Sequence, residues 1–77
     1  MAKAQVEKEV VVNQHIGKRI RKRRIELSMT QTELGNHLPT SFQQIQKYEK
    51  GANGVSSAKL IYIAHALQVP ITYFFEG

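Results

Sequence analysis

The sequence lacks cysteine entirely, and its apolar runs extend over only a few residues. Without cysteine, neither a disulfide nor a thiolate metal ligand can stabilise the fold. A membrane-spanning helix needs about 20 consecutive apolar residues, and no basic start leads into an apolar signal core. With 77 residues in total, we expect one small cytoplasmic domain without a membrane segment, which depends on its apolar core for stability.

Groups of residues that carry catalysis or hold a metal are lacking as well. The three histidines, His15, His37 and His65, are spread along the chain without the spacing of metal ligands. Nothing in the sequence pairs a nucleophile with a base, and a domain of this size offers no obvious substrate pocket. We therefore expect no enzyme, no metal, no cofactor and no small-molecule ligand.

Acidic residues are scarce, with six Asp and Glu against eleven Lys and Arg and a formal net charge of +5. A clustered positive charge is typical of a chain whose partner carries phosphate. The alternative is that the cluster is only a solvated helix face. Six of the eleven basic residues fall within residues 18–24: Lys18, Arg19, Arg21, Lys22, Arg23 and Arg24.

Residues 1–12 combine mixed charges with three consecutive valines, and they show neither a helical period nor a turn signal. We expect a flexible N-terminal extension here, with a short strand that pairs with a partner as the alternative. Residues 13–77 are predicted to form the folded domain. Its first helix begins after Asn13, a favourable N-cap, and ends near Ser28. The apolar stripe of this helix consists of Ile16, Ile20 and Leu27.

Three later helices each begin at a local capping signal. The expected N-caps are Thr30, Ser41 and Ser56, and the first two open a capping box that Glu33 and Gln44 complete. Proline disfavours a helical residue before it, and glycine adopts the left-handed conformation that ends many helices. The predicted ends of the first two of these helices are therefore His37, ahead of Pro39, and Gly51.

Apolar residues recur at helical spacing in these segments and define the expected core. Residues 71–75 are expected to form a last helical turn that closes this core, and the aromatic residues there could also form a dimer seam. The sequence thus predicts an all-α bundle of five helices without a strand in the folded part. The expected core residues are Ile45 and Tyr48 after Ser41, and Leu60, Ile63, Ala64 and Leu67 after Ser56.

The second and third predicted helices are short and are joined by a brief turn. The third helix begins with amide side chains. In this context the stretch from residue 16 to residue 75 resembles the lambdoid phage repressor and Cro family, also called the Xre type. The resemblance implies a compact five-helix bundle of the lambda-repressor type, in which the second and third helices form a helix-turn-helix unit. The residues that carry it are Thr30, Gln31, Leu34, Ser41, Ile45, Tyr48, Glu49, Gly51, Leu60, Ile63, Ala64, Leu67, Val69, Phe74 and Phe75.

The chain departs from this family at two positions. Pro39 stands in the turn where such proteins have glycine, and because proline cannot adopt positive φ the turn must follow another path. Gly35 stands where they have alanine, which allows the second and third helices to approach at least as closely. Similar proteins also pair the arginine at the position of Arg24 with the glutamate at the position of Glu49. Such a pair would give Arg24, which lies beside the apolar stripe, a carboxylate partner.

The resemblance also implies which side chains meet DNA. Gln43 suits bidentate pairing with adenine, Lys47 suits guanine, and Phe42 can contact the methyl group of thymine. The alternative for the glutamines is ordinary exposed helix surface. The side chains expected to face bases in the major groove are Phe42, Gln43, Gln46 and Lys47. Phosphate contacts are expected from Gln31, Arg19, Arg23, Ser41, Gln44, Asn53, Ser57 and Lys59.

We therefore expect a transcriptional regulator, and specifically a repressor, that binds double-stranded DNA as a homodimer with half-sites about one helical turn apart. The alternative is a protein-interaction module of the same fold, such as an antitoxin or an adaptor, which would bind DNA without sequence preference. RNA binding is a third hypothesis, but the sequence lacks the aromatic platforms on strands with which RNA-binding modules stack bases.

Overall fold

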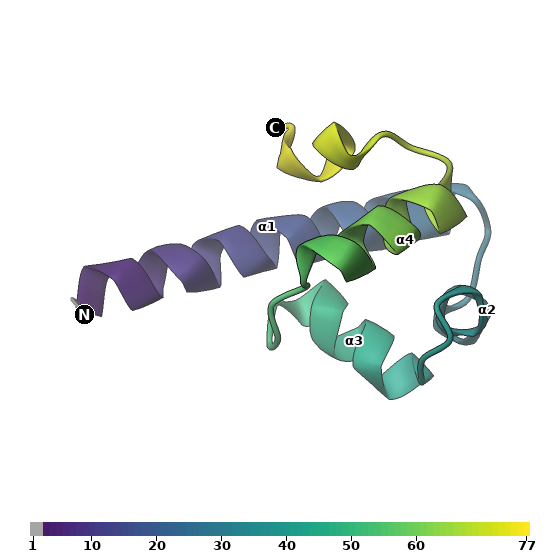
Figure 1. The fold of residues 1–77 in the computed structure, drawn as a ribbon, viewed down its shortest axis with the longest axis horizontal. Coiled ribbons are helices and arrows are strands. Elements are labelled where there is room, and N and C mark those ends of the chain that lie inside the picture. Colours follow the sequence, from purple (N-terminus) through teal and green to yellow (C-terminus); the bar gives the residue numbers. More distant parts are fainter. Residues whose placement is uncertain (1–2) are drawn as a thin grey trace.

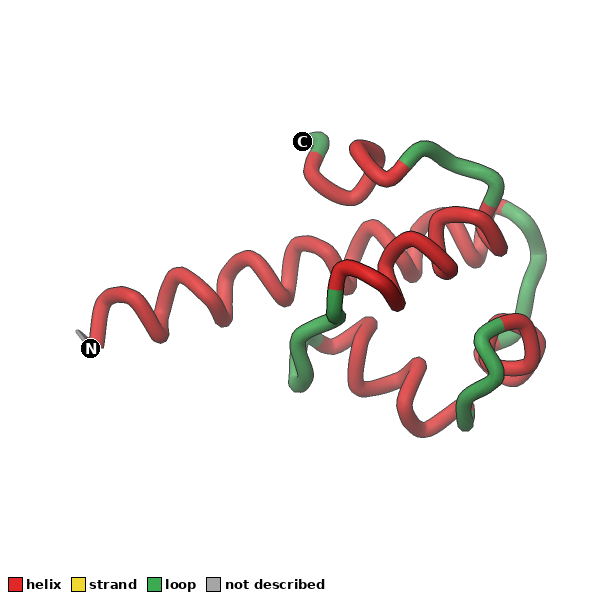
Figure 2. Tube along the Cα trace, viewed as in Figure 1, coloured by secondary structure: helices red, strands yellow, loops and turns green. Residues whose placement is uncertain are grey.

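Four α-helices and one 3-10 helix make up the fold (Figures 1 and 2), which a computed structural model describes for residues 3–77, with side chains from Glu7 onward. Within this range no residue is in a strand, so the predicted all-α class is confirmed. The prediction of five helices is corrected in one respect, because the last of the five elements is a 3-10 helix of five residues and not an α-helix. The elements are α1 (Lys3–Glu26), α2 (Gln31–His37), α3 (Phe42–Lys50), α4 (Ser57–Leu67) and η1 (Ile71–Phe75).

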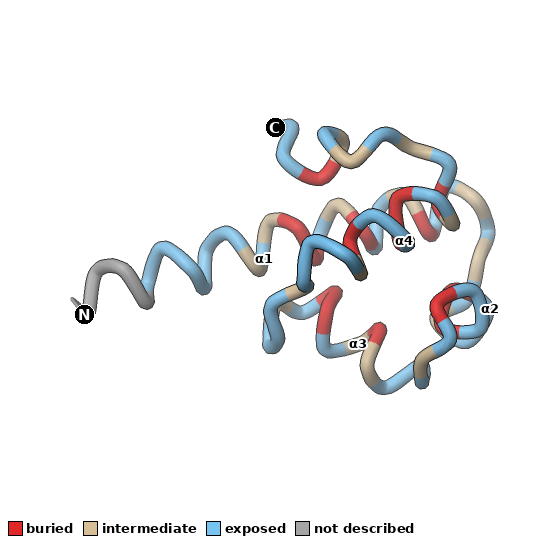
Figure 3. The backbone as a smooth tube through the Cα atoms, in the orientation of Figure 1, coloured by how far each residue is buried: buried red, intermediate tan, exposed pale blue. Residues whose placement is uncertain are grey.

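The other elements are arranged around helix α1 (Figure 1). Helix α3 and η1 lie on opposite sides of its C-terminal half, α4 runs alongside it, and α2 lies near its C-terminal end. The core fills the space between them, and its buried segments appear on the facing sides of all five elements (Figure 3). The core side chains are Ile16, Ile20, Leu34, Leu38, Ile45, Tyr48, Leu60, Ile63, Ala64, Leu67 and Phe74.

The start of α1 differs from the prediction. The helix begins at Lys3 instead of after Asn13, and Val10 to Val12 are helical, so the alternative of a strand there is wrong. Valine costs only a few tenths of a kcal/mol more than good helix formers. Once the packed half of a helix exists, each further residue adds one hydrogen bond without a new nucleation cost. Residues 1 and 2 of the expected flexible extension lie outside the described residues.

The three N-caps are confirmed, but only the first of the two predicted capping boxes is complete, because the Gln44 side chain makes no bond to the backbone amide of Ser41. The side chains of Thr30, Ser41 and Ser56 each accept a hydrogen bond from the backbone amide three residues later, and at Thr30 both bonds of the capping box are present. Helix α3 ends at Gly51 with φ 73°, as predicted, whereas α4 ends with Gln68 in the same left-handed region. These helix ends are local features, so the sequence around each of them suffices to specify it.

The turn between α2 and α3 contains no residue at positive φ. The carbonyl oxygen of Gly35 accepts hydrogen bonds from the amides of both Leu38 and Thr40, at 3.1 Å and 2.7 Å. Pro39, which has no amide hydrogen to donate, lies exposed between them. Helix α2 ends at His37 as predicted, although Leu38 itself keeps right-handed helical angles. A Cβ at Gly35 would lie 2.6 Å from the carbonyl oxygen of Thr40, so this turn requires glycine.

Candidate nucleic-acid interface

Helix α3 has one face in the core and one face in solvent. Ile45, Tyr48 and Glu49 are buried, whereas Phe42 is 43% exposed and Gln43 and Lys47 are also exposed. The exposed residues are spaced so that they share the outer side of the helix, and the helix forms the lower edge of the molecule in Figure 3. Of the four side chains expected to face bases, three are exposed and Gln46 is partly exposed.

A close approach of two backbones holds α3 against α1. A Cβ at Gly17 would lie 2.3 Å from the carbonyl oxygen of Tyr48 and 2.6 Å from that of Glu49. No real Cβ is found so near to a backbone oxygen, so only glycine permits this crossing. The crossing presses the C-terminal half of α3 onto α1 and leaves the side that carries Gln43 and Lys47 facing outward.

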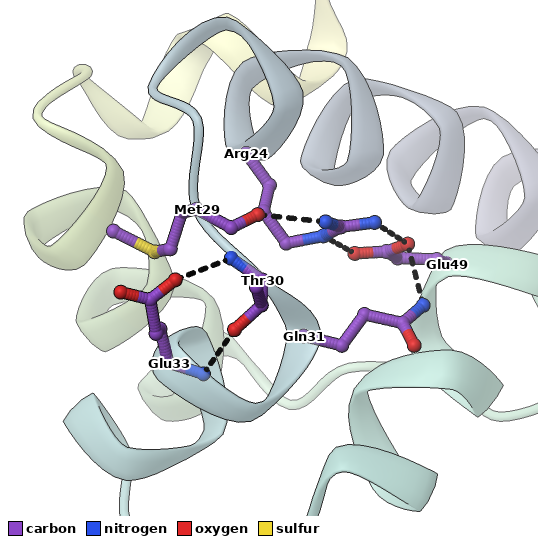
Figure 4. A network of polar contacts seen from close by, with 6 residues as sticks. All are labelled: Arg24, Met29, Thr30, Gln31, Glu33 and Glu49. Carbon is purple, nitrogen blue, oxygen red and sulfur yellow. Dashed lines mark hydrogen bonds and ion pairs between the residues drawn. The ribbon is translucent and has the colours of Figure 1, made fainter.

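A buried ion pair joins α1 to α3 (Figure 4). The guanidinium of Arg24 donates to both carboxylate oxygens of Glu49, at 2.6 Å through Nε and 3.0 Å through Nη2, and to the carbonyl oxygen of Met29 at 2.8 Å. Arg24 and Glu49 are only 8% and 7% exposed. The pair implied by the family resemblance is therefore present, and its two-pronged geometry is the kind that compensates the loss of hydration on burial.

Gln31 joins the same network from α2. Its Nε2 donates to Oε1 of Glu49 at 3.1 Å, and the side chain is partly buried (Figure 4). The sequence analysis assigned Gln31 to phosphate contact and missed this bond, because no local pattern relates residue 31 to residue 49. The network therefore fixes α3 to both α1 and α2 at its C-terminal half.

Arg19 and Arg23, two of the expected phosphate contacts, are engaged within the chain on the η1 side of α1. Arg19 donates to the carbonyl oxygen of Tyr73 at 2.9 Å and to the carboxylate of Glu76 at 3.3 Å, and its Cζ lies 3.9 Å from the centroid of the Tyr73 ring. Arg23 donates to the carbonyl oxygen of Leu67 at 2.9 Å. The structure thus does not bring these two arginines to the outer face of α3.

The other expected phosphate contacts lie at or beyond the ends of α3. Ser41 caps its N-terminus and is exposed, and Gln44 follows in the first turn with partial exposure. Asn53 is exposed in the loop after α3, and Ser57 and Lys59 lie in the first turn of α4, where Lys59 is partly buried. These residues thus come from the start of α3, from the loop after it and from the start of α4.

The described residues offer neither a cluster of metal ligands nor a helix suited to a membrane. Residues 3–77 contain no group of three or more histidine, aspartate or glutamate side chains that could hold a metal ion. None of the helices described is long and apolar enough to cross a membrane.

The fold and the outer face of α3 define a helix-turn-helix protein. A short helix, a tight turn and a second helix with an exposed polar face are fixed to a supporting helix, as this class requires. The model of the helix-turn-helix family HTH_3 matches residues 20–74, so the chain belongs to this family.

Curated relatives share about half of their sequence with this chain over the matched region. An uncharacterized HTH-type transcriptional regulator of Sinorhizobium medicae (strain WSM419) is 53% identical over 62 residues, which are 80% of this chain and 45% of the relative. An uncharacterized transcriptional regulator in the ATPase CF(0) region of Rhodospirillum rubrum is 52% identical over 65 residues, which are 84% of this chain and 60% of the relative. The chain thus spans about half the length of these relatives.

Solved structures share the fold. The clp gene regulator ClgR from C. glutamicum has a TM-score of 0.80 at 25% identity, over 83% of this chain and 83% of that chain. The restriction-modification controller protein C.AhdI from Aeromonas hydrophila has a TM-score of 0.77 at 22% identity, over 80% of this chain and 94% of that chain. The second likeness shows the fold alone.

Proposed function

We propose that this chain is the DNA-binding part of a transcriptional regulator and reads double-stranded DNA by inserting α3 into the major groove. The observation that carries the proposal is the outer face of α3, where Phe42, Gln43 and Lys47 are exposed on a helix that is fixed on its other side. The major groove admits one helix and presents a distinct pattern of donors and acceptors for each base pair. The names of the relatives as transcriptional regulators support the same conclusion.

The chemistry of the exposed side chains suggests what each would read. The amide of Gln43 matches N6 and N7 of adenine, the ammonium group of Lys47 matches O6 and N7 of guanine, and the ring of Phe42 fits a thymine methyl group. Gln46, one turn after Phe42 and partly exposed, would contact a neighbouring base. We therefore expect at least one thymine in each half-site.

Contacts to phosphate would set the position of α3 along the groove. We propose that Ser41 and Gln44 meet the backbone at the start of α3, and that Asn53, Ser57 and Lys59 meet it beyond the end of the helix. Gln31 would contribute its remaining amide atoms, and Arg19 and Arg23 would contribute only by giving up the bonds to Tyr73, Glu76 and Leu67 described above. As a homodimer on a two-fold operator, the protein would act as a repressor by covering a promoter.

Selection of bound sequences from random duplexes tests the proposal. Wild type should enrich a two-fold site, and Gln43→Ala should lose the preference at one base step in each half-site. His65→Ala is the control, because His65 is an exposed polar residue on α4 that belongs neither to α3 nor to the expected phosphate contacts, and this variant should enrich the wild-type site. Enrichment of no sequence by the wild type would overturn the proposal and favour a protein-interaction module, whose binding to DNA is only electrostatic.

A further inference from the structure

The first half of α1 projects beyond the body of the molecule without a partner (Figures 1 and 3). Among the side chains that the structure describes, from Glu7 onward, the first buried one of α1 is Ile16, and every side chain from Glu7 to Val12 is exposed. Val10, Val11 and Val12 are 44%, 63% and 50% exposed. Three adjacent valines on an unpacked helix are an unusual use of apolar side chains, since surface helices normally turn such residues to a core.

The projecting half of α1 is sustained as a helix by its continuity with the packed half, because extension costs no new nucleation. Isolated helices shorter than about 12–15 residues are marginal even with sequences rich in alanine, and valine favours a helix less than alanine does. The first turn of α1 also has no acidic residue to complement the positive end of the helix dipole. A contact that covers exposed valine side chains of the projecting half would therefore stabilise it.

An apolar surface leads from the projecting half onto the body. A hollow of about 330 Å³ lies between α1 and the end of the chain, and Phe75, which is 57% exposed, is one of its walls. A contact that covers the valines would thus bury an aromatic ring as well, which adds apolar area at the centre of an interface. The residues that line the hollow are Val11, Val12, His15, Ile16, Phe75 and Gly77.

The distribution of charge along α1 indicates what kind of surface covers it. Glu7 and Glu9 precede the valines, whereas the exposed basic residues Lys18, Arg21 and Lys22 follow them. Lys8, which is exposed as well, lies between the two glutamates, so the charges are ordered only on the helix face that carries Val11, where Glu7 precedes the valine and Lys18 follows it. A second α1 that runs in the opposite direction has the complementary order of charges.

The geometry points to an isologous contact between two copies of this chain. We propose that two α1 helices pack antiparallel through their projecting halves, with the Phe75 surface at the flank of the contact. Glu7, Val11, Gln14 and Lys18 are separated alternately by four and three residues, so they lie on one helix face. A two-fold axis between Val12 and Asn13 is about 8 Å along the helix from both Glu7 and Lys18, so each Glu7 lies beside Lys18 of the partner subunit. This inference rests on the proposed function, because a two-fold operator requires a second copy of the chain.

Sedimentation of the 77-residue chain tests the contact directly. As the concentration is raised to about 1 mM, the mass of the wild type should approach twice that of the 8.8 kDa chain. Val11→Glu should remain a monomer over the same range. Circular dichroism establishes that the variant keeps the folded body. Ile61→Glu is the matched control, because Ile61 on α4 is an exposed branched apolar side chain like Val11, at 49% against 63%, and this variant should remain a dimer. A monomeric wild type, or a control that dissociates while Val11→Glu does not, would overturn the inference.

A charge exchange tests the antiparallel arrangement. Glu7→Lys and Lys18→Glu should each weaken the dimer about tenfold, because each places two pairs of like charges in the symmetric contact. The double variant should restore the wild-type dissociation constant, and failure to restore it would overturn the arrangement. If the protein is a monomer that still selects one half-site, the contact is wrong and the proposed function stands. If it is a dimer without base preference, the proposed function is wrong and the contact stands.

Discussion

Arg24 and Glu49 form the only ion pair of the described residues in which both side chains are buried. Because neither charge is hydrated, removing one of them leaves the other without compensation. Glu49→Gln should therefore lower the free energy of unfolding by about 3 kcal/mol, measured by urea denaturation. Arg24→Met combined with Glu49→Leu should recover most of this loss, because no charge then remains in the core. An unchanged midpoint for Glu49→Gln would contradict the assignment.

Gly17 allows the closest backbone approach among the glycines that the structure describes. A Cβ at this position would lie 2.3 Å from a carbonyl oxygen of α3, so Gly17→Ala must push α3 away from α1. We expect a loss of about 1–3 kcal/mol in the free energy of unfolding, despite the better helix propensity of alanine. Gly54→Ala is the control, since a Cβ there would be 3.5 Å from the Asn13 side chain and should change stability by less than about 0.5 kcal/mol. Equal effects of the two substitutions in thermal melts would count against the role of Gly17.

The ionisation of Glu33 makes the stability of the N-terminal end of α2 depend on pH. Hydrogen bonds from the backbone and then the side chain of Thr30 hold the pKa of this carboxyl below its ordinary value. A lowered pKa in the folded state means that the stabilisation is complete above the unfolded value of about 4.3 and is lost as the pH falls through the folded value. The difference in melting temperature between wild type and Glu33→Gln should therefore narrow as the pH is lowered from 7 into this acid range. A difference that does not depend on pH would show that the charge of Glu33 is not involved.

The position of α3 depends on α2 as well as on α1, through the bond from Gln31 to Glu49. Gln31→Ala should lower the free energy of unfolding by about 1 kcal/mol without any DNA present. A residue that only contacts phosphate would leave the stability of the free protein unchanged, so calorimetry of the free protein distinguishes the two roles. Thr32→Ala, at an exposed neighbouring position of α2, is the control and should have little effect.

The elements that the sequence predicted well are those whose determinants are close along the chain. The N-caps at Thr30, Ser41 and Ser56 each depend on atoms three residues apart, and the core stripe of α4 follows from helical spacing alone. The start of α1 was misjudged because a helix can extend from a packed half through residues that show no period of their own.

The candidate site was predictable to a similar extent. The exposure of Gln43 and Lys47 follows from the burial of Ile45 and Tyr48 on the same helix. The partners of Arg19 could not be read from the sequence, because Tyr73 and Glu76 lie 54 and 57 residues further along the chain. The pair of Arg24 and Glu49 was accessible only through the family resemblance, since periodicity showed that Arg24 lay beside the apolar stripe but not what it met.

For the molecule as a whole, a net charge of +5 makes the affinity for DNA depend on salt. Each phosphate contact lowers the slope of log K against log salt concentration by about 0.9. Lys59→Ala, at the start of α4, should make the slope shallower by about that amount in titrations from low to moderate salt. Lys8→Ala removes the same charge from the projecting half of α1, away from α3, and should leave the slope nearly unchanged. An equal change for both variants would show that net charge alone governs binding.

The residues of α3 that hold it in place and the residues that it displays are separate sets. Ile45, Tyr48 and Glu49 carry the packing and the ion pair, while Phe42, Gln43 and Lys47 have no part in the core. On the function proposed above, exchange of the displayed side chains would therefore alter the preferred operator without a penalty in folding. A scaffold of this kind allows duplicated genes to acquire separate targets through very few substitutions, because changes in recognition need no compensating change in the interior.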